Sequence, residues 1–213
     1  MFGEGRGPLT SNVGEAGVFL STRGDVDVPD CQLELAPVMW VDEGLSTPRD
    51  HAFAIGVIAP LKPTSRGKVT LRSARPDAKP RILHNYLATQ ADRATMIAGV
   101  RVAMEIFRQA ILSTVRGAPY SVPASDAESD IVTFFERQTG SGYHPTSTCA
   151  IGQVVDPELR VIGIEGLRVA DASVMPSIVR GNTNAPVIAI AEKAADLIRG
   201  TTAAHALTNH RRR

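Results

Sequence analysis

Cysteine is scarce in this sequence, and its scarcity excludes a fold stabilised by disulfides. Two cysteines, Cys31 and Cys149, occur among 213 residues, whereas small disulfide scaffolds need several pairs. A reducing compartment is the simpler expectation for such a chain. Long apolar runs are also missing: no stretch approaches the roughly 20 residues that cross a bilayer, and the first residues carry no apolar signal segment. The sequence therefore predicts a soluble, cytoplasmic protein without a membrane span.

An excess of either charge is absent as well. The 23 basic and 22 acidic residues are well mixed and give a formal net charge of +1. Such a composition favours neither nucleic acid nor an acidic membrane surface as a partner. We expect residues 201–213, which end in three arginines, to form a flexible tail. We also expect no metal, because no paired metal-ligand spacing is visible at four of the five histidines: His51, His84, His205 and His210.

The phosphate-binding fingerprint of dinucleotide-binding folds is missing too. Gly3, Gly5 and Gly7 lie close together, but Pro8 stands where the third glycine of GxGxxG is needed, and no strand precedes the run. Residues 1–16 are therefore expected to form a leader or linker. The remaining chain, with 43% hydrophobic residues overall, is long enough for one sizeable domain or two small ones.

Short strand-like segments follow this leader. They alternate partly between apolar and polar residues and are separated by Pro, Gly and Asp turns, which is typical of successive strands in an antiparallel sheet. The predicted strands lie within residues 18–20, 31–38, 53–58 and 68–71.

Two helices are predicted after the strands. Thr89 and Asp92 resemble a capping box with Asp in place of Glu, and the pattern is repeated by Ser125 and Glu128 before a shorter helix. The first helix has one apolar stripe, which we assign to the core: Met96, Val100, Ala103, Met104, Phe107 and Ile111. Strands followed by helices indicate an α+β fold with a mixed or antiparallel sheet.

Residues 140–200 combine the parts of a site. Pro145 favours an extended backbone at His144, so a fixed, non-helical segment should present the imidazole. Residues 167–170 are predicted to form a brief buried strand that stops at Asp171. The turn at residues 181–185 precedes a helix with Pro186 in its first turn and Gly200 at its end. Its predicted apolar residues recur at helical spacing: Val187, Ile188, Ala191, Ala194, Ala195 and Ile198.

Three motifs in this region closely resemble the C-terminal signature of the glucose-methanol-choline (GMC) family of FAD-dependent oxidoreductases, and its choline-dehydrogenase-like branch above all. The first is Tyr143-His144-Pro145, the second joins DPELRV at 156–161 to GLRVADASVMP at 166–176, and the third is GNTNAP at 181–186. A lone GxGxxG would be a weak signal. Three motifs in one order across residues 143–186 are far more specific.

The resemblance covers the C-terminal part of such an enzyme, because the family carries its GxGxxG unit near the N-terminus of a much longer chain. It implies a substrate-binding domain at 17–142 and, at 143–200, the C-terminal segment of an FAD-binding α/β domain. It also implies FAD as cofactor, a small alcohol as substrate, and an N-terminal FAD-binding part that is supplied elsewhere.

The resemblance also assigns roles to single residues. His144 matches the catalytic histidine, the residue type best suited to take up a hydroxyl proton near neutral pH. Asn182 matches a second active-site position that holds His or Asn, where an amide would orient the substrate oxygen. The segments that reach FAD in the family correspond here to Asp171 and Ala172, and to Asn182, Thr183, Asn184, Ala185 and Pro186.

Other interpretations stay open. His144 could be a structural histidine, Asp171 could simply end a strand, and the asparagines could merely cap a helix. Cys149 could be a nucleophile, although a small buried thiol is the simpler role. At the level of function, the alternatives to alcohol oxidation are an inactive truncated or split half, a lyase of the hydroxynitrile lyase type that contains FAD, and a Ser or Cys hydrolase, for which no nucleophile elbow is visible.

Overall fold

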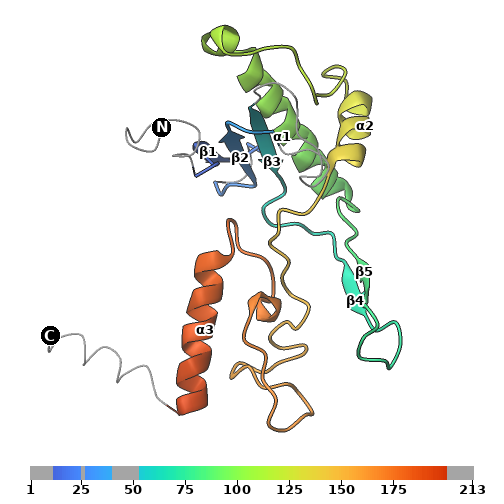
Figure 1. Cartoon of the computed structure of the whole chain (residues 1–213), viewed down its shortest axis with the longest axis vertical. Coiled ribbons are helices and arrows are strands. Elements are labelled where there is room, and N and C mark those ends of the chain that lie inside the picture. The colour runs from blue at the N-terminus through green and yellow to red at the C-terminus, as the bar shows by residue number, and fades with distance from the viewer. Residues whose placement is uncertain (1–11, 25–26, 40–52, 201–213) are drawn as a thin grey trace, which may run out of the picture. The chain divides into compact units, whose positions relative to one another are not determined.

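The computed structural model describes residues 12–24, 27–39 and 53–200, which belong to two compact units. The first unit contains the described residues up to Gly67 together with His84–Gly142, and the second contains Lys68–Leu83 and the described residues from Tyr143 onwards. The main elements (Figure 1) are β1 (Ala16–Leu20), β2 (Cys31–Ala36), β3 (Ala54–Ile58), β4 (Lys68–Thr70), β5 (Arg81–Leu83), α1 (Gln90–Arg108), α2 (Glu128–Gln138) and α3 (Asn184–Arg199).

The first unit is built on an antiparallel sheet with the strand order β1-β2-β3. Leu33 lies opposite Val18 on one side and Val57 on the other. The first three predicted strands are therefore confirmed, and so is the antiparallel sheet of an α+β fold. Within β2, Cys31, Gln32 and Leu33 are all buried, so both faces of the central strand are covered at this end.

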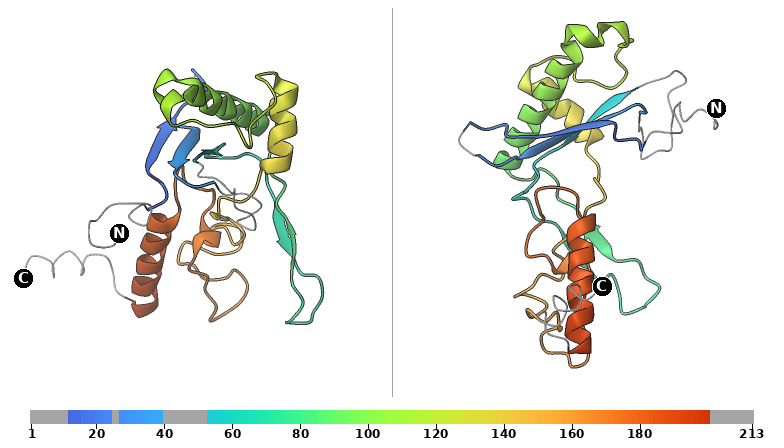
Figure 2. Two further views of the ribbon diagram at one scale, coloured as in Figure 1. Left: turned by 45° about the horizontal axis from the view of Figure 1, so that its top comes forward. Right: turned by 90° about the vertical axis from the view of Figure 1, so that its left-hand side faces the viewer.

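Helix α1 covers one face of this sheet (Figure 2). Ala103 packs with Cys31 and Leu33, and Gly99 lies close against the sheet. A Cβ atom at Gly99 would lie 2.9 Å from the sulfur of Cys31 and 2.9 Å from a methyl carbon of Val57. The predicted stripe is correct as far as Phe107, but Ile111 is wrong: it lies beyond the helix, in the 3₁₀ helix Ala110–Thr114, and is 84% exposed.

Of the two predicted capping boxes, the structure contains only one half of the first. Thr89 does cap α1 and accepts a hydrogen bond from the N–H of Asp92. The reciprocal half of the box is wrong, because the Asp92 carboxylate binds Thr64 and Ser65 instead. The second cap is also wrong: Ala127 precedes α2, and no side chain caps it.

Helix α2 completes the first unit's second core cluster. Ile131 and Phe135, both almost fully buried, pack against α1 residues including Met96 and Val100. The helix ends at Gln138, and the chain then leads to the segment that carries His144.

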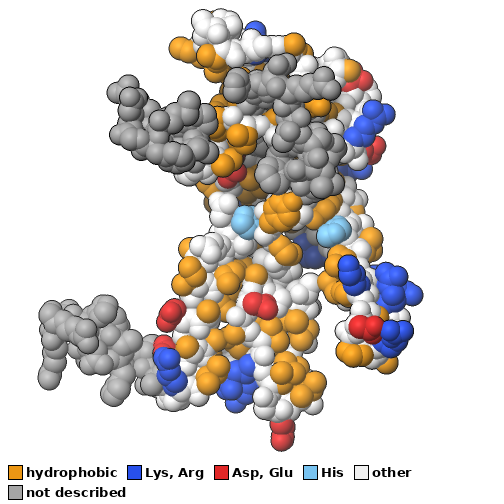
Figure 3. All heavy atoms as spheres, viewed as in Figure 1, with side chains coloured by type: hydrophobic (Ala, Val, Ile, Leu, Met, Phe, Trp, Pro, Cys, Tyr) orange, Lys and Arg blue, Asp and Glu red, His pale blue; other side chains and the backbone are white. Residues whose placement is uncertain are grey.

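The second unit contains a separate hairpin of β4 and β5, joined by Lys68↔Leu83 pairing. The fourth predicted strand is confirmed as β4. Basic side chains gather on this hairpin (Figure 3), and all of them are exposed: Lys68, Arg72, Arg75, Lys79 and Arg81.

The core of the second unit joins α3 to the loops before it. Val155, Leu159, Val174 and Ala194 form this core, with Ile190 and Leu197 packed against it. Helix α3 is confirmed and ends at Gly200, whose φ of 68° suits glycine. The predicted face is only partly correct, because Ile188 and Ile198 are exposed and Ile190 and Leu197 take the inner positions.

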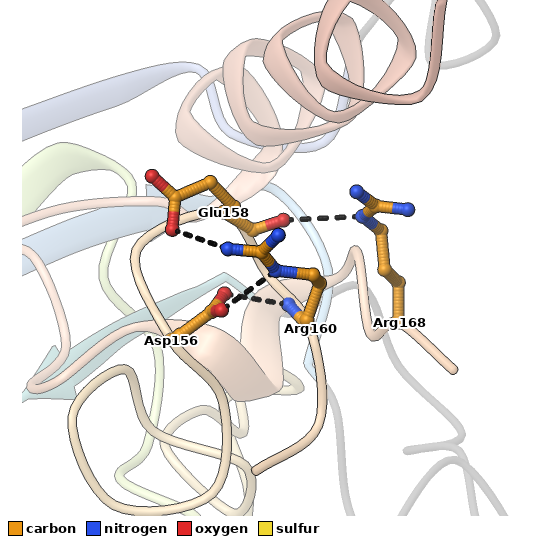
Figure 4. Close-up of polar contacts among 4 residues, drawn as sticks. All are labelled: Asp156, Glu158, Arg160 and Arg168. Carbon is orange, nitrogen blue, oxygen red and sulfur yellow. Dashed lines mark hydrogen bonds and ion pairs between the residues drawn. The ribbon is translucent and has the colours of Figure 1, made fainter. Parts of the chain in front are cut away.

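The buried strand predicted at residues 167–170 is wrong. This segment makes only an isolated bridge between Arg160 and Arg168, and Leu167 is 48% exposed. The turns at Gly163 and Gly166, both with positive φ, leave too few paired residues for a strand. Two ion pairs and a hydrogen bond join residues of this loop (Figure 4): Asp156 pairs with Arg160 at 2.8 Å, Glu158 pairs with Arg160, and the Glu158 backbone carbonyl accepts a hydrogen bond from Arg168.

Candidate active site

His144 lies in a short segment of unusual backbone geometry. Tyr143 and Ser147, on either side of it, have φ angles of 59° and 73°, a region that residues other than glycine rarely adopt. Strained backbone of this kind occurs preferentially at functional sites. The segment is held in place by its neighbours: Ser147, Cys149 and Ile151 donate backbone hydrogen bonds to the carbonyl oxygens of residues 172, 173 and 174.

Both ring nitrogens of His144 have partners from the turn before α3. Nδ1 lies 2.8 Å from the hydroxyl oxygen of Thr183, and Nε2 lies 3.2 Å from the side-chain nitrogen of Asn182. His144 is half-buried, Thr183 is buried and Asn182 is exposed. The structure thus brings together residues that lie 38 and 39 positions apart in the chain.

The placement of the Asn182 amide nitrogen selects one tautomer of the neutral imidazole. A carboxamide nitrogen can only donate hydrogen bonds, so the Asn182 nitrogen requires a lone pair on Nε2. The ring proton then lies on Nδ1 and is donated to the Thr183 oxygen. In this state Nε2 is the atom that can accept a further proton, and it faces the exposed side chain of Asn182.

The N-terminus of α3 adds an electrostatic feature to the same place. The turn that carries Asn182 and Thr183 leads directly into this helix, and Asn184 and Ala185 at its start are exposed. The first N–H groups of a helix have no intrahelical acceptor and lie at the positive end of its dipole. This end of the helix therefore favours an anion or an electron-rich ring edge.

Asp171 has a structural contact of its own. Its Oδ1 atom accepts a hydrogen bond of 2.8 Å from the N–H of Ser173 and another from the Ser173 hydroxyl. The side chain therefore caps the 3₁₀ helix η4 (Ala172–Val174). This is the turn whose carbonyl oxygens hold the segment after His144, so Asp171 supports the site through the backbone.

Cys149 is not placed as a nucleophile for His144. The two ring nitrogens of the histidine contact Thr183 and Asn182, whereas the Cys149 backbone N–H binds the carbonyl oxygen of Ser173. The thiol is free and half-buried.

Within the described residues, no group of three or more His, Cys, Asp or Glu could hold a metal ion, and no helix is long and apolar enough to cross a bilayer.

An apolar cavity of about 380 Å³ lies elsewhere in the second unit. Its lining comes from α3 and from residues 151–176, and Lys193 is its single charged side chain. Neither His144 nor Asn182 belongs to this lining. The lining contains no histidine and no carboxylate.

Comparison with known proteins gives a consistent result. The family described as GMC oxidoreductase matches residues 63–191. An uncharacterized GMC-type oxidoreductase of Mycobacterium tuberculosis is 47% identical over 203 residues, which are 91% of this chain and 38% of that protein. Human mitochondrial choline dehydrogenase is 43% identical over 197 residues, 89% of this chain and 33% of that enzyme.

Solved structures agree with these relatives. Pyridoxine 4-oxidase from Mesorbium loti superposes with a TM-score of 0.75 at 26% identity, covering 89% of this chain and 38% of that one. A formate oxidase variant of Aspergillus oryzae RIB40 studied for FAD modification gives 0.74 at 29% identity, covering 82% and 32%. This chain thus spans less than two fifths of the length of each of these proteins. It belongs to the GMC oxidoreductase family.

Proposed function

We propose that this chain carries the catalytic side chains for FAD-dependent oxidation of an alcohol to an aldehyde or ketone. The observation that carries the proposal is the pair of contacts that leaves Nε2 of His144 with its lone pair beside the exposed Asn182 amide. A base and a hydrogen-bond donor side by side are what removal of a hydroxyl proton requires.

In this proposal each side chain has a defined task. Nε2 of His144 accepts the hydroxyl proton of the substrate, which displaces the Asn182 amide from that nitrogen. The amide then donates its hydrogen bond to the substrate oxygen and stabilises the negative charge that develops there. The alcohol carbon loses a hydride, and its oxygen becomes a carbonyl. General-base help of this kind contributes about 10²–10⁴ in rate.

The residues near His144 fit FAD, which supplies the hydride acceptor when bound. The fit is electrostatic: the exposed start of α3 would stabilise negative charge on a reduced flavin ring. We propose that Asn182 to Pro186 lie against that ring and that the backbone of Asp171 and Ala172 contacts the cofactor. The side chain of Asp171 is already engaged with Ser173, so we assign the contact to the main chain.

The same proposal includes a partner and a domain division. We infer that residues 17–142 bind substrate and that residues 143–200 complete an FAD-binding domain. The rest of that domain would come from an N-terminal part, since the relatives are more than twice as long as this chain. We also propose that the protein is cytoplasmic, and its two free thiols support this location.

The test is anaerobic flavin reduction by a panel of alcohols, choline among them, in the FAD-loaded protein. His144→Ala should lower the reduction rate by about 10²–10⁴. His84→Ala is the matched control, because His84 is exposed and bonded only to Tyr86 among the contacts described for its ring. Unchanged reduction in His144→Ala would refute the role of His144 as base.

Two further measurements on the same protein separate the alternative functions. Failure of the 213-residue chain to hold FAD, with recovery once an N-terminal FAD-binding part is added, would identify it as one half of an enzyme. Cleavage of a cyanohydrin without bleaching of the flavin would identify a lyase instead.

A further inference from the structure

Thr183 occupies a helix-capping position without capping the helix. It directly precedes α3, where the side chain of a threonine ordinarily accepts a hydrogen bond from the second or third helical N–H. No such bond is present for Thr183. Two features explain this. Its backbone is already helical, with φ −89° and ψ −7°, and the third helical residue is Pro186, which has no N–H to offer.

The hydroxyl that is not used for capping faces the imidazole. Its oxygen lies 2.8 Å from Nδ1 of His144, and Thr183 is only 7% exposed. Water therefore has little access to this side of the ring, and the hydroxyl is the partner that Nδ1 has in the folded chain. In a free histidine side chain, by contrast, the neutral ring carries its proton mainly on Nε2.

We propose that Thr183 is a positioning residue that holds His144 in the tautomer protonated at Nδ1, and that Pro186 makes this possible by removing a competing donor for the hydroxyl. The inference rests on the proposed function, because only that tautomer presents a lone pair at Nε2 to an alcohol. The Thr183 side chain acts through His144, because its hydroxyl is engaged with the imidazole, and we assign the proposed flavin contact of this residue to its main chain.

A hydroxyl is required, whereas the shape of threonine is not. Thr183→Val keeps the volume and removes the acceptor, so an Nδ1–H would be left buried without a partner. The exposed Asn182 amide can instead turn its oxygen towards an Nε2–H. Thr183→Ser keeps the acceptor and should preserve the tautomer. Thr95→Val is a matched control, since Thr95 is a buried threonine of α1 that donates its own hydrogen bond to Ala91.

The direct test is the tautomer of His144 in the 213-residue chain labelled with ¹⁵N at its histidine rings. Long-range ¹H–¹⁵N spectra above neutral pH distinguish a protonated ring nitrogen from an unprotonated one, and His144→Gln identifies the signals. We expect Nδ1 protonated and Nε2 unprotonated in the wild type, in Thr183→Ser and in Thr95→Val. In Thr183→Val we expect Nε2 to become the mainly protonated nitrogen.

Two results would overturn the proposal: a wild-type ring protonated at Nε2, or a Thr183→Val ring that keeps its proton at Nδ1. Unfolding of Thr183→Val would be visible as lost amide dispersion. The wild-type and Thr183→Ser spectra would then decide, because the proposal requires the Nδ1–H form in both.

Kinetics of the FAD-loaded protein provide a second readout. Thr183→Val should lower the rate of flavin reduction at saturating alcohol by about tenfold or more, and by no more than the about 10²–10⁴ that general-base help contributes. KM should change little, and Thr183→Ser should restore the rate. The two hypotheses fail separately: full activity in His144→Ala refutes the proposed function, whereas an unchanged tautomer in Thr183→Val refutes only the role of Thr183.

Discussion

The carboxylate of Asp92 in α1 accepts a hydrogen bond of 2.7 Å from the backbone N–H of Ser65, which lies 27 residues earlier in the chain. The backbone N–H and the hydroxyl of Thr64 donate to the same carboxylate, each at 2.9 Å. Asp92 itself is only 2% exposed. One buried acid of the helix thus anchors the segment that leads towards β4.

Replacing this acid should weaken the first unit. Asp92→Asn keeps the size of the side chain but turns one acceptor oxygen into a donor, which leaves a backbone N–H of Thr64 or Ser65 without its acceptor. We expect the free energy of unfolding to fall by about 1–3 kcal/mol, measured by urea denaturation. Asp126→Asn is the control: its carboxylate binds Arg108 on an exposed surface and should matter much less. Equal losses in both variants would contradict the role of Asp92 as an anchor.

The same anchor should depend on pH. Burial alone would raise the pKa of Asp92, but the hydrogen bonds from Ser65 and Thr64 outweigh it and lower that pKa below its usual value. A carboxyl group whose pKa is lower in the folded chain stabilises it above the unfolded-state pKa and loses this effect as pH falls through the folded-state pKa. The stability difference between wild type and Asp92→Asn should therefore shrink on acidification. A difference that stays constant down to low pH would contradict this.

Gly99 should not tolerate a methyl group. In a helix interior, Gly→Ala ordinarily stabilises by about 1 kcal/mol, but here the new Cβ would lie 2.9 Å from both Cys31 and Val57. Overpacking of this kind costs about 1–3 kcal/mol, so we expect a net loss of stability in thermal and urea denaturation. Gly56→Ala, whose Cβ would meet only a carbonyl oxygen at 3.8 Å, provides the comparison. A stabilised Gly99→Ala would show that Cys31 and Val57 move aside.

The two thiols should differ in reactivity. Burial, with a smaller contribution from the charge of Asp30, raises the pKa of Cys31 from 9.0 to about 11. At pH 8 a thiol-specific reagent should therefore modify Cys149 first and reach Cys31 only after unfolding. Peptide mapping of the modified protein checks this, and rapid labelling of Cys31 in the native chain would contradict it.

The raised pKa of Cys31 also predicts a stability change in alkaline solution. The unfolded chain loses the Cys31 proton near pH 9, where the folded chain still retains it. Stability from this group is therefore complete below the unfolded-state pKa and is lost as pH rises towards about 11. Cys31→Ala should remove this part of the alkaline loss, although it lowers stability at neutral pH.

Local patterns were sufficient for much of the fold. Alternation identified the strands around Leu33 and Val57, and the helical repeat identified α1 and α3, because each pattern reports which side of an element is buried. The pattern failed where few neighbours supply that burial. β5 (Arg81–Leu83) was missed because its three residues are all exposed, and Leu167 looked like core although it is about half exposed.

The candidate site was predictable only in part, because local sequence patterns do not report contacts between distant segments. The resemblance to the family identified His144 and Asn182, and the structure places them in contact. Thr183 was predicted only to contact the cofactor, since its hydrogen bond to His144 joins segments 39 residues apart. The one local signal was a threonine at a capping position with a proline three residues later. Asp92 shows the same limit: its capping-box position was visible in the sequence, but its partners at residues 64 and 65 were not.

The hydrogen bonds of His144 have an energetic consequence for the reaction that we propose. They join the imidazole to Thr183 and Asn182 within the folded chain, so folding itself sets the orientation of the base that we propose. The reorganisation needed when an alcohol arrives is then confined to one exposed amide that exchanges Nε2 for the substrate oxygen. The orientation of the His144 imidazole should therefore be lost together with the fold of residues 143–186, and not at a separate, earlier step of unfolding.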